Sequence, residues 1–305
     1  MAHDMSKKLS AAGMLVTLGI IYGDIGTSPL YVMKAIVGDR PITEQLVLGG
    51  VSCVFWALTI QTTLKYIILT LRADNHGEGG IFSLYALVRR YARTVYIPAT
   101  IGAACLLADG IITPPISVSS AIEGLGGVPG LEDVIVPGGD LTVTIVIAII
   151  SALFLIQRFG TKVVGTVFGP MMLIWFSMLL ILGIVQVGHY PEVLKCINPK
   201  YAYDLLVNYP QGFWLLGAVV LCTTGAEALY NDLGHVGLSN VRMSWIFVKT
   251  ALVLNYMGQG AWILHSGLDV LDGKNPFYAV MPGWFLLTGI IISALATIIA
   301  SQAVI

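Results

Sequence analysis

Residues 11–31, AAGMLVTLGIIYGDIGTSPLY, begin as an uncharged apolar run and are then interrupted by an acid among helix breakers. The acid is Asp24, and Gly23, Gly26 and Pro29 surround it. In lipid, every unpaired backbone group is costly, so a spanning helix breaks only where the break faces protein or a water-filled cavity. The stretch therefore predicts a broken membrane helix that holds a carboxylate at its break.

The whole chain has the composition of an all-α integral membrane protein. Of its 305 residues, 56% are hydrophobic and 11% are charged, and the mean hydropathy is +0.84. A soluble domain carries about 25% charged residues, so this is not the composition of a globular enzyme, and the lipid bilayer is the expected partner. The net charge of −1 gives no indication of a nucleic-acid partner.

Apolar segments long enough to cross a membrane, which takes about 20 residues, are expected at eight places. They are residues 12–36, 45–71, 96–124, 141–157, 164–188, 211–236, 244–266 and 283–305. The polar connector at 72–93 is expected to form a turn followed by a short amphipathic helix on the membrane surface.

The basic residues predict the orientation of these spans. If the N-terminus is cytoplasmic, nine basic residues lie in inner segments: Lys7, Lys8, Arg72, Arg89, Arg90, Arg93, Arg158, Lys162 and Arg242. Five lie in outer segments: Lys34, Arg40, Lys195, Lys200 and Lys274. This bias predicts a cytoplasmic N-terminus and a cytoplasmic 72–93 connector. Lys65 lies within a span near its inner end, where snorkelling explains it.

A second apolar segment is interrupted in a similar way. Residues 222–230, CTTGAEALY, place hydroxyls, a glycine and Glu227 near the middle of the 211–236 span. Comparable breaks five spans apart predict two inverted repeats with the substrate between their broken first helices. We assign residues 1–190 to the first repeat and 205–305 to an incomplete second repeat.

The 96–124 span adds a third acid. Asp109, Thr113 and Ser117 are four residues apart and share one helix face, before the Pro114–Pro115 pair disturbs the helix. The two hydroxyls could instead satisfy backbone carbonyls that the prolines set free. Glu123, near the outer end, is expected to be a solvated residue at the mouth of the site and not a ligand.

These oxygen-rich positions suit a hard monovalent cation that has lost its water. Asp24 would supply the negative charge, unwound carbonyls would add ligands, and Glu227 could carry a proton in and out. Structural roles stay open: Asp24 as a helix cap, Asp109 as a hydrogen-bond acceptor or ion-pair partner, and Glu227 as a hydrogen-bonding residue. No His or Cys cluster in the spans suggests a transition metal.

Five stretches together resemble the KUP/HAK/KT family of potassium uptake permeases. They are GIIYGDIGTSPLYV, LRADNHGEGGIFSLYALV, ITPPISVSSAIEGL, TTGAEALYNDLGHVG and ATIIASQAVI. The resemblance implies a LeuT-like inverted-repeat fold of the amino acid–polyamine–organocation superfamily, with helices 1 and 6 discontinuous. It also implies potassium uptake by symport with protons across the bacterial cytoplasmic membrane, with no cofactor besides the transported K⁺ and H⁺.

Carried over residue by residue, the resemblance implies a potassium site and a proton-coupling acid. The potassium site would comprise Asp24, Tyr31, Asp109, Thr113, Ser117 and Thr224, and Glu227 would couple the proton. Position 109 is Asp where other members can carry Glu, which changes its reach and keeps its charge. The family's last spans and C-terminal cytoplasmic domain are not in this sequence, so we expect it to be an N-terminal part of a longer protein.

Two other functions stay open from the sequence. The first is an organic-solute symporter on the same fold, for which the acid at the break is unfavourable to an anionic amino acid. The second is a potassium-responsive membrane sensor that binds without flux. The oligomeric state is also open, a homodimer included.

Overall fold

The computed structural model describes residues 9–73, 75, 78–131, 134–157, 165–231 and 236–304. Over these residues the chain is helical, and its only β-type pairing is an isolated bridge between Asn75 and Glu78. Lys7, Lys8, Arg158 and Lys162, four of the residues used for the orientation, lie outside the described part. The prediction of an all-α protein is confirmed for the described residues.

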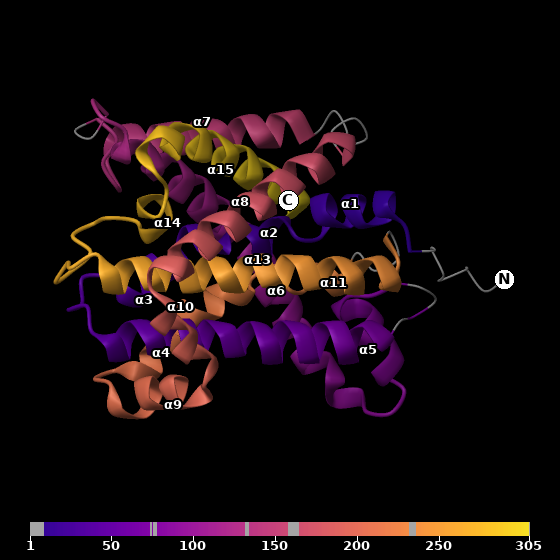
Figure 1. Cartoon of the computed structure of the whole chain (residues 1–305). Helices are drawn as coiled ribbons and strands as arrows, with labels where there is room; N and C mark the ends of the chain where they lie inside the picture. Colours follow the sequence, from indigo (N-terminus) through magenta and orange to yellow (C-terminus); the bar gives the residue numbers. More distant parts are fainter. Residues whose placement is uncertain are drawn as a thin grey trace.

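The helices follow one another along the chain as labelled in Figure 1. The first half contains α1 (Ala11–Ile20), α2 (Gly23–Thr27), η1 (Ser28–Leu30), α3 (Val32–Val37), α4 (Glu44–Ala57), η2 (Leu58–Leu69), η3 (Thr70–Arg72), α5 (Ile81–Val88), η4 (Arg93–Val95), α6 (Tyr96–Glu123), η5 (Gly124–Gly127) and α7 (Asp140–Gln157). The second half contains α8 (Gly165–His189), η6 (Pro191–Ile197), α9 (Pro199–Asn208), η7 (Gly212–Leu215), α10 (Leu216–Val220), η8 (Leu221–Thr223), α11 (Ala228–Asn231), α13 (Leu238–His265), α14 (Pro276–Ala279) and α15 (Gly283–Val304).

Fewer helices than the eight expected spans are long and apolar enough to cross a membrane. In the described residues there are five: Glu44–Arg72, Tyr96–Gly127, Phe168–His189, Gly212–Asn231 and Gly283–Gln302. The bent pair α1 and α2 makes a sixth if it counts as one span. The shorter apolar stretch Asp140–Leu155 does not reach spanning length. The 28-residue α13 is long enough, but Arg242, Lys249 and buried amides make it more polar than a typical span.

The first span bends earlier than the sequence predicts. α1 and α2 meet at 71°, with the break at Ile21 and Tyr22, whereas residues 23–30 form the short helices α2 and η1. Tyr22 fixes this bend, because its buried hydroxyl donates to the carbonyl of Val241 at 2.7 Å and its ring stacks on Trp245. Pro29 fits at the start of η1, where no backbone N–H is needed.

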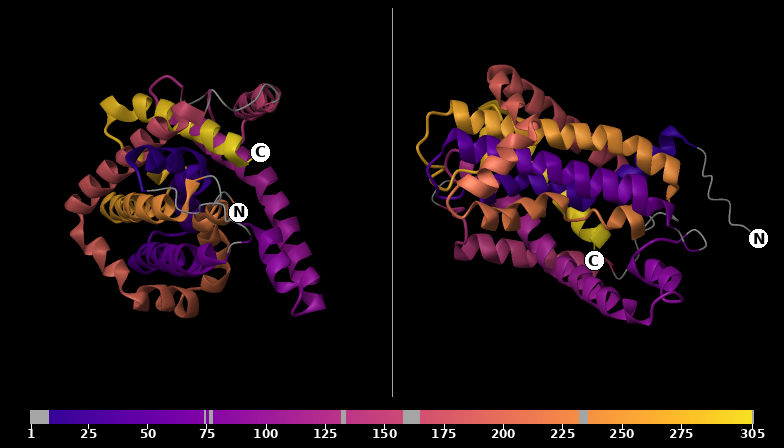
Figure 2. Two further views of the ribbon diagram at one scale, coloured as in Figure 1. Left: turned by 90° about the vertical axis from the view of Figure 1, so that its right-hand side faces the viewer. Right: turned by 90° about the horizontal axis from the view of Figure 1, so that it is seen from below.

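α13 forms the centre of the bundle and packs against α8, α4 and α1. Figure 2 shows α13 enclosed by other helices, while α6 lies at the edge of the bundle. α6 accordingly exposes large apolar side chains, such as Leu107 and Ile111, to the surroundings. Figure 1 places α5 and α11 at the end of the bundle near the N-terminus, and α9 and α14 at the opposite end.

Candidate functional site

Hydroxyl groups from both broken segments and from α6 meet beside the break in the first span. The Ser28 Oγ lies 3.3 Å from the Tyr31 hydroxyl and 3.3 Å from the Thr224 Oγ1. The Thr27 Oγ1 lies 3.4 Å from the Ser117 Oγ of α6. Ser28 and Thr224 are 196 residues apart in sequence, so the fold brings the two interrupted stretches together. We call these five residues the hydroxyl cluster.

Asp24 lies next to this cluster and is 3% exposed. Its Oδ2 is buried and has no hydrogen-bond partner among the described residues, and α2 begins without a side-chain cap. The capping role for Asp24 is therefore not seen. A buried carboxylate oxygen without a donor is costly, and a cation is one group that can compensate it.

Gly225 lets the second broken segment approach Asp24 closely. A Cβ on Gly225 would lie 2.6 Å from the Asp24 Cβ and 2.8 Å from its Oδ2. The backbone at Gly225 has φ +78°, a conformation that favours glycine. The small size and the backbone freedom of Gly225 thus allow the two broken segments to lie this close together.

The α6 residues share one helix face, as their spacing predicts. The Thr113 Oγ1 donates to the Asp109 Oδ1 at 2.7 Å, and Ser117 follows one turn later, where it meets Thr27. α6 continues through Pro114 and Pro115 to Glu123, so the prolines do not end the helix. Thr113 thus contacts a carboxylate, and Ser117 contacts another hydroxyl.

Three backbone carbonyls in α2 and η1, directly after the bend in the first span, are already paired with side-chain donors. The Trp175 indole N–H donates to the Gly26 carbonyl at 2.9 Å. The amides of Gln259 and Asn275 donate to the carbonyls of Pro29 and Leu30 at 3.0 and 2.8 Å. Each of these three carbonyls thus already accepts one hydrogen bond and keeps one lone pair. That unwound carbonyls serve as ion ligands stays a prediction, and the side-chain oxygens are the less occupied candidates.

A cavity of about 480 Å³ adjoins the cluster on the side of α5 and α11. Among the predicted site residues, Asp109, Thr224 and Glu227 line it, whereas Asp24, Tyr31, Thr113 and Ser117 do not. The predicted site is therefore divided between residues that line the cavity and residues that are enclosed by protein.

Glu227 lies in a turn between η8 and α11, within the interruption of the 211–236 span that the sequence predicts. It interacts electrostatically with Asp109, which also lines the cavity, and both act on the buried Asp24. Three acids in mutual range repel one another, and a cation or a proton between them relieves that repulsion.

The sequence itself matches a described family over nearly its full length. Residues 11–305 match the family described as the K⁺ potassium transporter integral membrane domain. The chain belongs to this family. The resemblance to potassium uptake permeases is thereby confirmed.

Curated relatives of this transporter domain carry matching names. The probable potassium transport system protein Kup of Cytophaga hutchinsonii is 62% identical over 98% of the chain and 45% of its own length. The proteins of that name from Flavobacterium johnsoniae and Clostridium perfringens are 60% and 51% identical over 99% and 98% of the chain, and 46% of their own lengths. The chain thus spans less than half the length of these relatives. They are named as transport proteins, which agrees with the prediction that the chain is not an enzyme. No solved structure matches the chain.

Three residues of the transporter domain take part in the site although the sequence did not single them out. Thr27 and Ser28 belong to the hydroxyl cluster, and Lys65 lines the cavity that also contains Asp109 and Glu227. The GTSP run beside Asp24 could have indicated the first two. The sequence did not indicate that Lys65 lines the cavity, because snorkelling is a sufficient explanation for a lysine near the end of a span.

Glu123 of the transporter domain is not the solvated residue that the sequence predicts. Its side chain is 17% exposed and forms an ion pair with Lys34 at 3.1 Å, and the Ser119 hydroxyl donates to its other oxygen. The tertiary fold brings α3 to the end of α6 and so supplies the partner that the local sequence lacks.

Proposed function

We propose that the complete protein imports potassium by secondary active symport with protons. The hydroxyl cluster beside Asp24 carries this proposal: neutral oxygens from both broken segments and α6 gather next to a buried carboxylate whose Oδ2 has no donor in the described part of the chain. This chemistry fits a dehydrated monovalent cation better than an organic anion or a transition metal. The names of the relatives point to the same substrate.

In this proposal potassium is held by Asp24, Tyr31, Asp109, Thr113, Ser117 and Thr224. Asp24 supplies the full negative charge, and the hydroxyls replace part of the hydration shell. Thr113 orients Asp109 through their 2.7 Å hydrogen bond. Asp109 and Thr224 also line the cavity, so an ion leaving the cluster would meet them next.

Glu227 is the residue that would couple the proton. It lines the cavity within electrostatic range of Asp109 and Asp24. Its negative charge would attract a cation held by those two acids, and protonation would remove that attraction. Protonation of Glu227 from the outer side would favour closure over the bound ion, and release of that proton to the inside would reset the cycle.

We further propose a LeuT-like arrangement of two inverted repeats, residues 1–190 and 205–305, working by alternating access. The 3.3 Å approach of Ser28 to Thr224 supports this arrangement, because it joins the break in each repeat. The cavity lies on the side of the 72–93 connector, whereas the Lys34–Glu123 ion pair joins α3 to the other end of α6. With the N-terminus in the cytoplasm of a bacterial cell, this corresponds to a state open to the inside.

The test is rubidium uptake by potassium-uptake-deficient cells that express the complete gene product. We expect uptake that a protonophore abolishes and that Asp24→Asn reduces at least tenfold. Wild-type uptake by Asp24→Asn would refute the site, and protonophore-insensitive uptake would refute the symport. Purified protein that binds rubidium but gives no flux in vesicles would favour a sensor.

A further inference from the structure

Tyr256 of α13 carries a buried hydroxyl that has no hydrogen-bond partner among the described residues. The side chain is 1% exposed. Two other buried tyrosines are paired: Tyr22 donates to the Val241 carbonyl, and Tyr278 to the Ser120 carbonyl. An unpaired buried hydroxyl is destabilising, and phenylalanine would fill the same space without that cost. The hydroxyl therefore calls for an explanation.

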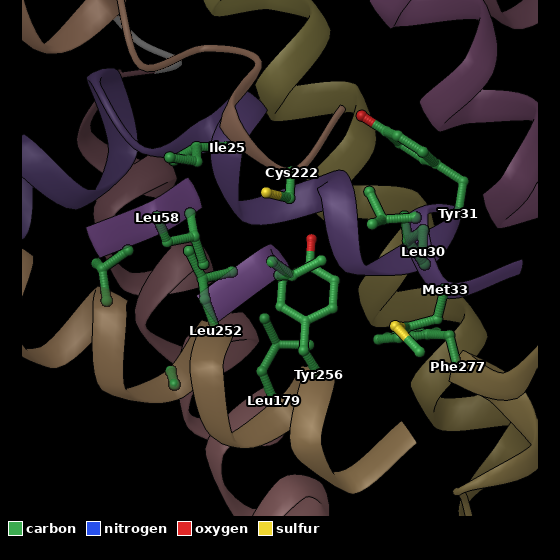
Figure 3. Close-up of a cluster of buried hydrophobic side chains, with 14 of the residues drawn as sticks. Ile25, Leu30, Tyr31, Met33, Leu58, Leu179, Cys222, Leu252, Tyr256 and Phe277 are labelled. Carbon is green, nitrogen blue, oxygen red and sulfur yellow. The ribbon is translucent and has the colours of Figure 1, made fainter. Parts of the chain in front are cut away.

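The hydroxyl of Tyr256 is directed at the place where the two broken segments meet. Figure 3 shows it pointing toward Cys222 and the first broken span, away from the apolar side chains around its ring. It is within electrostatic range of both Cys222 and Tyr31. Cys222 lies two residues before Thr224, and Tyr31 belongs to the hydroxyl cluster, so the Tyr256 hydroxyl faces the two segments that carry the proposed ion site.

The position of Tyr256 is fixed by its neighbours on the same helix. The Gln259 amide donates to the Pro29 carbonyl and, at 2.8 Å, to the Asn255 side chain. Asn255 in turn donates to the Leu179 carbonyl of α8 at 3.2 Å. These bonds attach α13 to η1 and to α8, so the phenol is presented to the site by a rigid support.

From these contacts we propose that the Tyr256 hydroxyl is a further potassium ligand, contributed by α13 when the ion is bound. This inference rests on the proposed function. Potassium is coordinated by several neutral oxygens, and the carbonyls of Gly26, Pro29 and Leu30 are already paired with Trp175, Gln259 and Asn275. A neutral phenol oxygen offers lone pairs to a cation and keeps its ring in the apolar core.

Tyr256→Phe in the complete gene product tests the proposal, because it removes one oxygen and keeps the ring. The KM for rubidium uptake should rise about five- to tenfold, as expected for the loss of one neutral ligand. The thermal stability of the purified protein without potassium should be equal or higher, since the described part of the chain gives the hydroxyl no partner. Stabilisation by added rubidium chloride should require a correspondingly higher concentration.

Tyr278→Phe is the matched control, since it removes a buried hydroxyl that is paired with the Ser120 carbonyl and with Ser293. It should lower thermal stability and leave the KM for rubidium unchanged. An unchanged KM and rubidium response in Tyr256→Phe would overturn the proposal, and so would a lower maximal rate at unchanged KM.

The outcome also separates this inference from the proposed function. If the wild type is stabilised by rubidium but does not transport it, the proposed function fails, and the rubidium response of Tyr256→Phe alone decides the role of Tyr256. If the wild type neither transports nor responds to rubidium, both proposals are wrong.

Discussion

Lys34 of α3 and Glu123 at the end of α6 form an ion pair of 3.1 Å at the end of the bundle opposite the cavity. Lys34 follows the cluster residue Tyr31 by three positions, and Glu123 follows Ser117 by six. The pair therefore joins two elements that carry residues of the proposed site. Both side chains are partly shielded, with 29% and 17% exposed.

Breaking this pair should destabilise the protein, and exchanging its charges should restore it. A pair of this exposure lies between surface and buried salt bridges, so Glu123→Gln should cost about 1–2 kcal/mol, because Lys34 keeps its charge without a partner. The double variant Lys34→Glu with Glu123→Lys should regain most of the loss in thermal unfolding of purified protein. Equal stability of Glu123→Gln and wild type would show that the pair contributes nothing.

Gly225→Ala should impair both folding and uptake. The added Cβ would lie 2.6 Å from the Asp24 Cβ, and φ +78° strains a residue with a side chain by about 1–2 kcal/mol. We expect lower thermal stability and rubidium uptake reduced at least tenfold, because the two breaks must move apart.

Gly217→Ala provides the control for that substitution. Gly217 lies in α10 of the same segment, and a Cβ there would meet no atom within 4 Å. Alanine should stabilise the helix by about 1 kcal/mol at that position and leave uptake unchanged. If the two variants behave alike, the close approach of Gly225 to Asp24 is not required.

Gln259→Leu should cost about 1–3 kcal/mol, because it leaves the buried Pro29 carbonyl without its donor. Gln45→Leu is the comparison: Gln45 also donates to a backbone carbonyl, that of Asp204, but in an exposed position. Its effect should stay within about 0.5 kcal/mol. Thermal unfolding of both variants measures the difference, and similar values would contradict the assignment of Gln259 as a support of the broken span.

The broken spans could be predicted because their signals are local. A segment that combines an acid with helix breakers in an apolar run is costly in lipid, wherever that run lies in the chain. The hydroxyls beside Asp24 and Glu227 are neighbours of these acids in the sequence, so they are found at the same time. The face shared by Asp109 and Thr113 also follows from helical spacing alone, and their hydrogen bond confirms it.

Features that depend on distant partners could not be predicted. The bend lies at Tyr22 because its hydroxyl bonds to Val241, 219 residues away. Glu123 is paired and not solvated because Lys34 reaches it from 89 residues away. The pairing of the Pro29 carbonyl depends on Gln259, and nothing near Pro29 in sequence indicates that donor. The count of spans failed for two other reasons. α13 is polar for a membrane helix and is buried by its neighbours, and the apolar stretch Asp140–Leu155 is shorter than a span.

Thr113→Val tests whether the hydrogen bond to Asp109 positions that acid for the ion. Valine keeps the shape of threonine and removes the hydroxyl that donates to the Asp109 Oδ1 at 2.7 Å. Without this donor the carboxylate is free to turn into the adjoining cavity, so the KM for rubidium uptake should rise about five- to tenfold. Thr250→Val is the control, because its hydroxyl donates to the Ile246 carbonyl on the exposed side of α13, and its KM should equal that of the wild type. A Thr113→Val protein with wild-type KM would show that Asp109 does not need this bond. Asp109→Asn keeps the bond but removes the charge, so its KM would then decide whether Asp109 acts on the ion at all.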